Sequence, residues 1–369
     1  MYLIWIGLLL LIIAVYLKRN KYLYIIQIAY LWFVAANNTW NADYVNYMNG
    51  YQFVFDYHGL ISEPIYWFLA KISNYIGLDF QGYRYLFFGI AYIVLGVSIW
   101  KLAIYPNIII GLYFLYPFSL DVIQMRSLMA NSLVIFAVWK MQLYINNNNT
   151  KDLISSIVFV ILATGFHYSA IAAAIIYLAL ISKQTFNRYF PKLVGIATVA
   201  LAVIVIFRTQ ISNKFMELGI IEKVTLYQTY DSEIGGYLIS VFVLRCIFVL
   251  ICWLAIHSPG KEFFENKNII ISNNQFLFRS VCVLSLYAFL ELFVSMEIER
   301  ISRVTLILGY VLLTNLSNIS QRNNYRIIKG LVVIFVAGYF YIMYFRHFAV
   351  SSNWFDYTFI PIFENNLLN

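Results

Sequence analysis

The chain has 369 residues, of which 62% are hydrophobic and only 11% are charged, and its mean hydropathy is +0.75. Soluble domains carry about 25% charged residues, so this composition excludes an ordinary soluble protein. The net charge of +8 invites a nucleic-acid interpretation, but the distribution of the basic residues along the chain argues against one.

Apolar runs predict an all-α fold, namely a polytopic integral membrane helical bundle with about 12 transmembrane helices, in a range of about 10 to 14. The predicted spans are residues 1–17, 23–36, 85–100, 108–120, 127–145, 153–166, 168–182, 193–207, 237–256, 276–295, 304–317 and 330–346. Several are shorter than the roughly 20 residues that a straight crossing needs, so we expect some short or broken helices. Residues 1–17 lack a basic n-region and a small-residue cleavage site, which predicts an uncleaved first helix.

Lysine and arginine set the predicted orientation. If Lys18, Arg19 and Lys21 are cytoplasmic, fifteen of the 25 basic residues fall inside with only three of the 17 acidic ones. Merging residues 153–182 into one span would destroy this separation, so we expect two segments there that meet near His167. The chain is then a single transmembrane domain, residues 1–369, whose external segments are residues 37–84, 119–126, 208–236, 297–303 and 347–369. The basic excess is therefore a topology signal, and no nucleic-acid partner is expected.

The first external segment contains NADYVNY, with Asp43, Tyr44 and Tyr47, and then EPIYWFLAKISNYIGL from Glu63. The second stretch predicts an amphipathic interfacial helix with Pro64 in its first turn. For each polar residue taken singly, loop polarity or helix capping is an explanation equal in weight to a functional role. Arg84 opens the next span, where a lone arginine is often an interfacial anchor.

Two further stretches place polar groups beside apolar runs. In SLDVIQMRSLMANSL, Asp121 and Gln124 have capping-box spacing, which predicts a helix start. A cap does not explain Arg126, whose guanidinium is suited to binding carboxylate or phosphate oxygens. In GFHYSA, His167 is expected on the same side of the membrane as Asp121 and Arg126.

Arg300 and Arg303, in MEIERISR, are three residues apart and are expected to share a helix face, where they could clamp a diphosphate. An ordinary charged interfacial turn is the alternative. The aromatic segment WFDYTFIPIFEN is expected to pack back onto the external face. The sequence contains no metal-ligand motif, P-loop or dinucleotide fingerprint, so no metal and no cofactor are expected.

These residues resemble the EpsG-type family of bacterial exopolysaccharide and O-antigen polymerases. The resemblance rests on DYVNY, on Glu63-Pro64, on DVIQMRSLMA at 121–130, on FHYSA at 166–170, on ERISR, and on the closing YTFIPIFEN. It covers nearly the whole chain, and QMRSLMA followed by FHYSA is its most specific part. It implies a membrane glycosyltransferase of capsule, exopolysaccharide or O-antigen synthesis. The enzyme would act on undecaprenyl-diphosphate-linked oligosaccharides, with its active site on the outer face of the bacterial plasma membrane.

The implied transfer assigns expected roles to the polar residues. Arg126, Arg300, Arg303 and Arg84 are expected to bind the diphosphate, and Arg126, His167, Asp43 and Asp121 to be catalytic. Sugar contacts are expected from Tyr44, Tyr47, Glu63, Trp67, Gln124 and Tyr168. Membrane lipid, a flippase and a chain-length regulator are the further partners that the resemblance implies.

Three other functions fit parts of the sequence. A lipid-linked oligosaccharide flippase or transporter would need a central polar cavity and usually internal repeats, and no repeat is visible. A polysaccharide acyltransferase would use His167 as its base. A polyprenyl-phosphate-sugar glycosyltransferase would depend chiefly on Asp43.

Overall fold

The computed structural model describes residues 2–55, 63–206, 231–257, 268–286, 299–317, 335–336, 338 and 355–369. Apart from one isolated bridge, every secondary-structure element within these ranges is a helix, which confirms the all-α prediction. The predicted span 330–346 lies outside them except for residues 335–336 and 338, and so does most of the predicted external segment 208–236.

Most helices in the first half of the chain overlap the predicted segments. The predicted span 108–120 is instead divided into two helices, and residues 44–52 form a helix that was not predicted. The helices of this half are α1 (Tyr2–Tyr16), α2 (Lys21–Asn37), α3 (Tyr44–Gln52), α4 (Pro64–Tyr75), α5 (Phe80–Leu102), α6 (Pro106–Leu115), α7 (Phe118–Ile123), α8 (Met125–Asn147) and α9 (Thr150–Phe166). Side-chain caps fix several starts: Asn20, Asp79 and Asn149 accept hydrogen bonds from the first backbone N–H groups of α2, α5 and α9. Pro64 occupies the first turn of α4, as expected.

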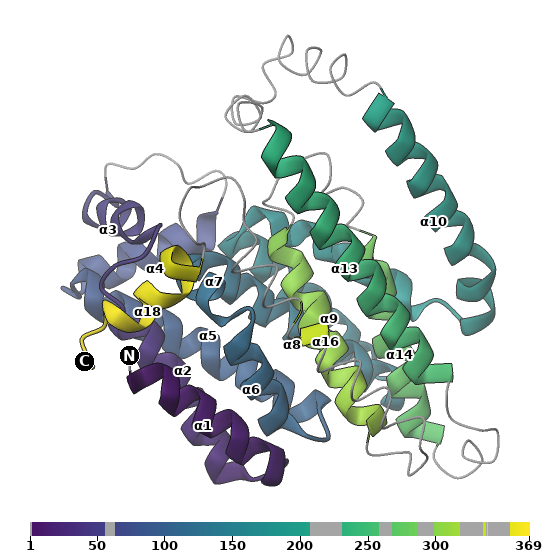
Figure 1. The fold of residues 1–369 in the computed structure, drawn as a ribbon, viewed down its shortest axis with the longest axis horizontal. Coiled ribbons are helices and arrows are strands. Elements are labelled where there is room, and N and C mark those ends of the chain that lie inside the picture. The colour runs from purple at the N-terminus through teal and green to yellow at the C-terminus, as the bar shows by residue number, and fades with distance from the viewer. Residues whose placement is uncertain are drawn as a thin grey trace.

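The second half is arranged around longer helices. Its described elements are η1 (Tyr168–Leu180), α10 (Lys183–Ile206), α13 (Asp231–His257), α14 (Asn268–Ser285), α16 (Glu299–Ser317), η4 (Phe355–Phe359) and α18 (Ile360–Glu364). Figure 1 shows α10 and α13 on the side of the molecule away from α1 and α2. The two elements expected within residues 153–182 are present as α9 and η1, and His167 lies between them.

The segment η1 is a 3₁₀-helix, whereas the apolar pattern suggested an ordinary span. Its buried residues are Ala170, Ala173, Ile176 and Ala179. These positions recur every three residues, which matches the roughly three residues per turn of a 3₁₀-helix. The tighter winding aligns small side chains along one face, and that face packs against α9 and α14.

Among the described residues, α5 and α8 are long and apolar enough to cross a membrane. Five further apolar segments are shorter, namely Tyr2–Tyr16, Pro106–Leu115, Tyr168–Leu180, Val243–Ile256 and Ser302–Leu316. Short and broken apolar helices are therefore present, and the number of twelve crossings stays a prediction.

Helix α8 lies at the centre of the packing. It contacts α5 and α9 along its length and also meets α7, α14, α16 and η1. Its residues from Ser127 to Ile135 are buried without interruption. Because so many elements meet on α8, side chains at its start are held by segments far apart in sequence.

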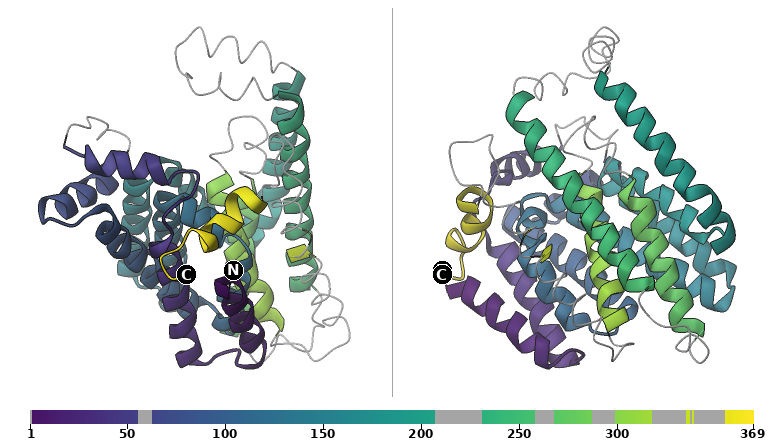
Figure 2. Two further views of the ribbon diagram at one scale, coloured as in Figure 1. Left: turned by 60° about the vertical axis from the view of Figure 1, so that its left-hand side comes forward. Right: turned by 45° about the vertical axis from the view of Figure 1, so that its right-hand side comes forward.

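The C-terminal segment packs back onto the bundle, as expected for its described part. Asn38, at the end of α2, pairs with Asn366 in an isolated antiparallel bridge. The Asn38 side chain also donates to the carbonyls of Pro361 and Asn365 at 3.0 and 3.1 Å. Tyr2 hydrogen-bonds to the Leu368 carbonyl, so both chain ends lie close together, as Figure 2 shows.

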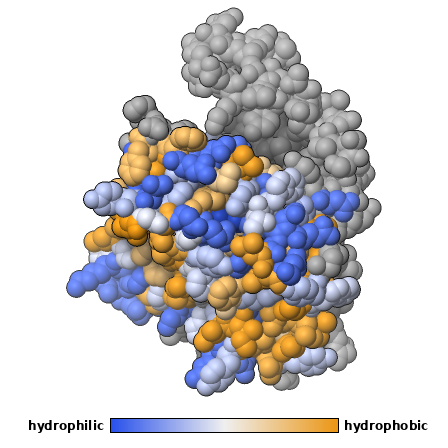
Figure 3. Space-filling view, turned by 90° about the vertical axis from the view of Figure 1, so that its left-hand side faces the viewer, coloured by the Kyte–Doolittle hydropathy of each residue, from blue (hydrophilic) through white to orange (hydrophobic). Residues whose placement is uncertain are grey.

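Helix α4 is amphipathic. Tyr66, Trp67 and Ala70 face the bundle, whereas Phe68 and Tyr75 are 62% and 84% exposed. Figure 3 shows hydrophobic patches between hydrophilic ones on the face that carries the N-terminal helices. An exposed aromatic edge suits a helix lying at a membrane interface, which was the sequence prediction for this segment.

Candidate functional site

Arg126, in the first turn of α8, is the centre of a polar cluster. Its guanidinium pairs with the carboxylate of Glu63, at the start of α4. It also lies over the rings of Tyr47 and Tyr66, 5.3 and 5.4 Å from their centroids. These are cation–π distances, so the arginine is oriented by a charge and two aromatic faces. Its side chain nevertheless remains 29% exposed.

Glu63 connects Arg126 to His167. Its second carboxylate oxygen lies 3.8 Å from His167 Nδ1, and both side chains are almost fully buried. The remaining ring nitrogen, Nε2, faces Arg300 Nη1 at hydrogen-bond distance. The sequence expectation that Arg126, His167 and Arg300 lie together is therefore met in the structure, through a carboxylate that was expected to bind sugar.

Both ring nitrogens of His167 face hydrogen-bond donors. Nε2 faces Arg300 Nη1, and a guanidinium can only donate. Nδ1 accepts from the Ser169 backbone N–H at 3.2 Å, and the Ser169 hydroxyl lies 2.9 Å from the same nitrogen. The imidazole is therefore engaged on both sides, with Arg300 and with the start of η1.

Asp121 belongs to a second ion pair, buried beside the first group. Its carboxylate accepts from Arg303 Nη1 and from the Tyr113 hydroxyl, both at 2.8 Å. Arg303 Nη2 donates to Gln124 Oε1 at 2.6 Å. The capping prediction for Asp121 and Gln124 is wrong. Asp121 lies inside α7, and neither it nor Gln124 makes a side-chain cap, because both engage Arg303 instead.

Asp43 lies at the outer edge of the cluster, just before α3. Its carboxylate makes no hydrogen bond or ion pair with another described residue, although Arg300 and Arg126 are near enough to act on its charge. Partial burial raises the pKa of Asp43, and the two arginines oppose that rise without cancelling it. A carboxylate with unused lone pairs and a raised pKa is suited to accepting a proton.

The cluster thus has two layers. Asp43, Arg126, Gln124 and Arg300 are partly exposed and can meet a ligand. Glu63, His167, Asp121 and Arg303 are each 3% exposed or less. Glu63 pairs with Arg126 and His167 meets Arg300, so these two buried groups orient the accessible arginines. Arg303, paired with Asp121, holds Gln124.

A close helix contact brings Glu63 to His167. Gly165, two residues before the histidine, faces Ile65, two residues after the glutamate. A Cβ at Gly165 would lie 2.5 Å from Ile65 Cδ1, which is a clash. The glycine therefore lets the start of α4 approach the end of α9.

The other residues expected in the site occupy varied positions. Arg84 is buried and donates to the carbonyls of Asn38 and Ala35, with its guanidinium 4.9 Å from the Tyr44 ring centroid. Trp67 is 8% exposed and packs edge-to-face on Tyr66. Tyr168 is 43% exposed, with its ring 5.2 Å from that of His167. Arg84 therefore lies outside the cluster, whereas Tyr168 lies at its edge.

Several supporting residues were not found from the sequence. Tyr66, Tyr113 and Asn131 each touch the cluster, and Asn131 donates to the Arg300 carbonyl at 2.9 Å. Tyr66 lies three residues after Glu63, a helical spacing that could have indicated it. Tyr113 and Asn131 lie within apolar runs and give no local signal.

Within the described part of the chain, no group of three His, Cys, Asp or Glu side chains could hold a metal ion. The arginines are the cations that the described cluster offers to an anionic ligand. Two of them, Arg126 and Arg300, are accessible.

Comparison with known proteins gives one family. The model of the EpsG family matches residues 21–359, which is nearly the whole chain. The match spans every residue of the cluster. No curated protein and no solved structure matches the chain.

Proposed function

Because the chain belongs to the EpsG family, whose members are membrane proteins of polysaccharide biosynthesis, we propose that it polymerises lipid-linked repeat units. The substrate would be an undecaprenyl-diphosphate-linked oligosaccharide of capsule, exopolysaccharide or O-antigen. The growing glycan would pass from its diphosphate carrier to the next lipid-linked unit at the outer face of the bacterial plasma membrane. A flippase and a chain-length regulator would act beside it.

One observation carries this proposal: a partly exposed carboxylate lies near two accessible arginines, above a buried polar layer. The two guanidiniums offer charge-assisted hydrogen bonds to a diphosphate, whose negative charge grows as it leaves. Arg300 is partly exposed, although its Nε is buried and makes no hydrogen bond with the described residues. Arg126 and Arg300 are thus the proposed diphosphate ligands.

The proposed chemistry moves one proton and breaks one bond. Asp43 accepts the proton of the acceptor hydroxyl as that oxygen attacks the anomeric carbon of the growing chain. The bond from this carbon to the diphosphate oxygen breaks, and its electron pair leaves on the diphosphate. His167, Glu63, Asp121 and Arg303 act in this scheme as positioning residues, because each is buried and engaged with the cluster.

Tyrosines at the mouth of the cluster are the proposed sugar contacts. Tyr44 and Tyr47 are partly buried beside Asp43, and Tyr168 exposes its ring beside His167. Aromatic faces stack on the apolar faces of sugar rings, while hydroxyls fix their orientation. Gln124 could add a hydrogen bond from its partly exposed amide.

A second enzyme function is also favoured by Asp43. A polyprenyl-phosphate-sugar glycosyltransferase needs one dominant carboxylate. The Asp43 carboxylate fits this role because it pairs with no other described side chain. That enzyme would transfer a single sugar and depend less on the two arginines. The loss of activity on replacing Arg126 or Arg300 therefore distinguishes the two functions, since it should be large for the polymerase and smaller for the single-sugar transferase.

The test is polysaccharide size in the producing cell. Arg126→Ala, Arg300→Ala and Asp43→Asn are each expected to leave single repeat units on lipid at normal protein levels. Lys101→Ala, at an exposed residue at the end of α5, is the matched charge control and should give full-length polymer. Loss of all external units would indicate a flippase, and missing acetyl groups on full-length chains an acyltransferase. Unchanged polymer in all three variants would refute the proposed site.

A further inference from the structure

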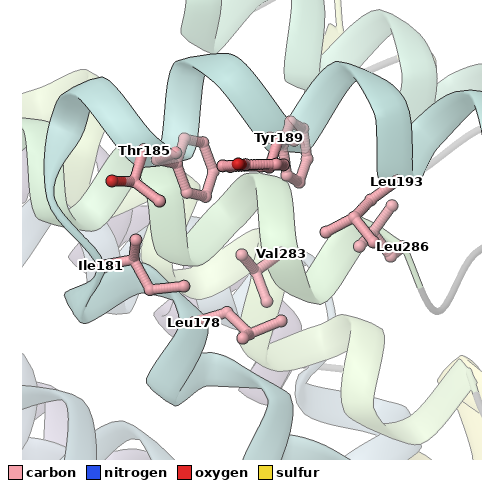
Figure 4. Close-up of a pocket in the computed structure, with 9 residues that line it drawn as sticks. Leu178, Ile181, Thr185, Tyr189, Leu193, Val283 and Leu286 are labelled. Carbon is pink, nitrogen blue, oxygen red and sulfur yellow. The ribbon is translucent and has the colours of Figure 1, made fainter.

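An apolar pocket lies far from the polar cluster, between the end of η1, the first turns of α10 and the end of α14. Its walls include Leu178, Ile181, Leu193 and Val283, as Figure 4 shows, and also Phe186. Its volume is about 140 Å³. A dry cavity of about 150 Å³ holds a small hydrocarbon such as benzene. The pocket therefore accommodates a short stretch of acyl chain.

The wall formed by α10 is built from stacked aromatic rings. Phe186 and Phe190 lie with centroids 4.6 Å apart and an interplanar angle of 14°. Phe186 is buried against Cys282 and Val283 of α14. This packing places the start of α10 against α14.

Three basic side chains lie over aromatic rings that line the pocket. Arg188 and Lys192 lie over the exposed ring of Tyr189, 5.5 and 5.6 Å from its centroid. Arg279 of α14 reaches the Phe186 ring at 6.0 Å and donates to the Ile181 carbonyl. The sequences of η1, α10 and α14 contain no Asp or Glu. An apolar cavity with three described cations beside it is complementary to an anionic amphiphile.

The location of the pocket indicates which amphiphile reaches it. It lies at the opposite end of η1 from His167, and η1 has 13 residues. At about 2.0 Å of rise per residue, the two ends are roughly 26 Å apart. That is close to the roughly 30 Å thickness of a bilayer core, so the pocket lies near the boundary opposite the polar cluster. The predicted topology makes this the cytoplasmic leaflet, where anionic lipids attract basic residues.

We propose that this pocket binds one anionic phospholipid of the cytoplasmic leaflet. One acyl chain enters between α10, α14 and η1, and the phosphate meets Arg188, Lys192 and Arg279. The exposed Tyr189 ring holds the two α10 cations at the headgroup level, where amphipathic rings are favourable. This inference goes beyond the proposed polymerase and does not depend on it.

Native mass spectrometry of the full-length protein tests the proposal. The protein is equilibrated with phosphatidylglycerol or phosphatidylcholine of identical acyl chains, and bound lipid is counted. The wild-type protein should retain phosphatidylglycerol on the order of ten-fold better than phosphatidylcholine, since each basic residue near an anionic headgroup adds to the free energy of binding. Equal retention of the two lipids by wild type would overturn the proposal without any variant.

Variants then locate the binding. Arg188→Gln combined with Lys192→Gln should abolish the preference, whereas Lys18→Gln combined with Lys21→Gln, where α1 leads into α2, should preserve it. Leu193→Trp, at a half-exposed wall position, should fill the pocket and reduce retention of both lipids. A preference that survives the α10 double variant, or falls equally in the control, would place the lipid elsewhere and refute this site.

Discussion

The carboxylate of Asp43 lies near Arg126 and Arg300 but pairs with neither. An ordinary aspartate titrates near pH 3.9. Burial moves the pKa of Asp43 above its ordinary value even against two positive neighbours. Because the folded chain binds the proton more tightly than the unfolded chain, ionisation of Asp43 opposes folding as pH rises through that value. The group is therefore costly to the fold, which is typical of residues retained for chemistry.

The raised pKa of Asp43 leads to a prediction with two readouts, namely activity and thermal stability. Polymerisation in membrane vesicles should fall as pH decreases through the raised pKa of Asp43, because a base must be ionised to accept a proton. Asp43→Asn should lose activity by at least about 100-fold while its melting temperature at pH 7 stays equal or rises. A lowered melting temperature with residual activity would instead make Asp43 a structural residue.

At the scale of elements, Gly165 sets the distance between α4 and α9. Because Cβ contacts this close require the neighbour to move, a side chain at Gly165 should push Glu63 away from His167. Gly165→Ala should reduce polymer length, although alanine ordinarily favours a helix by about 1 kcal/mol. The measurement is polysaccharide size together with protein level.

The control uses another glycine of the bundle. A Cβ added at Gly195, on α10, would meet no described atom within 4 Å, so Gly195→Ala should leave polymer unchanged. Ile65→Ala shortens the opposing side chain and should restore function to Gly165→Ala. If the double variant stays as defective as the single one, helix spacing is not the cause.

The C-terminal segment supports the same region through amide groups. Asn366 donates to the Val34 carbonyl at 2.9 Å, and Asn38 donates to the tail. Asn41 then donates to Asn38 Oδ1 at 2.7 Å and accepts from the Asp43 backbone N–H at 3.1 Å. A continuous set of hydrogen bonds thus runs from the end of the chain to the backbone of the proposed base.

For the whole molecule, the predicted topology places the two ends of α8 on opposite sides of the membrane. Its 23 residues extend roughly 34 Å at 1.5 Å per residue, enough to cross. In a protein whose three cysteines are replaced, Tyr75→Cys should react with an impermeant maleimide from outside intact cells. Asn147→Cys should react only after permeabilisation. Labelling of both from the same side would reject the orientation.

The sequence by itself determined the class of fold and most of its helices. Apolar runs separated by polar turns predict spanning helices because unpaired backbone groups are too costly in a bilayer. They located α1, α2, α5, α8 and α9 to within a few residues. The charge count also separated α9 from η1, and local motifs selected Arg126, His167, Arg300 and Asp43. The winding of η1 was not predictable, because a period of three in small residues resembles an ordinary apolar run.

Only the tertiary structure decided which polar groups pair. Capping spacing is a local property, and it suggested a cap for Asp121, whereas the charge of Arg303, 182 residues away, engages that carboxylate. In the same way, Glu63 was expected to contact sugar but connects Arg126 with His167. Burial then distinguishes the accessible Arg126, Arg300 and Asp43 from the groups that position them. These pairings depend on how α4, α8, α9 and α16 meet, and no spacing along the chain encodes that meeting.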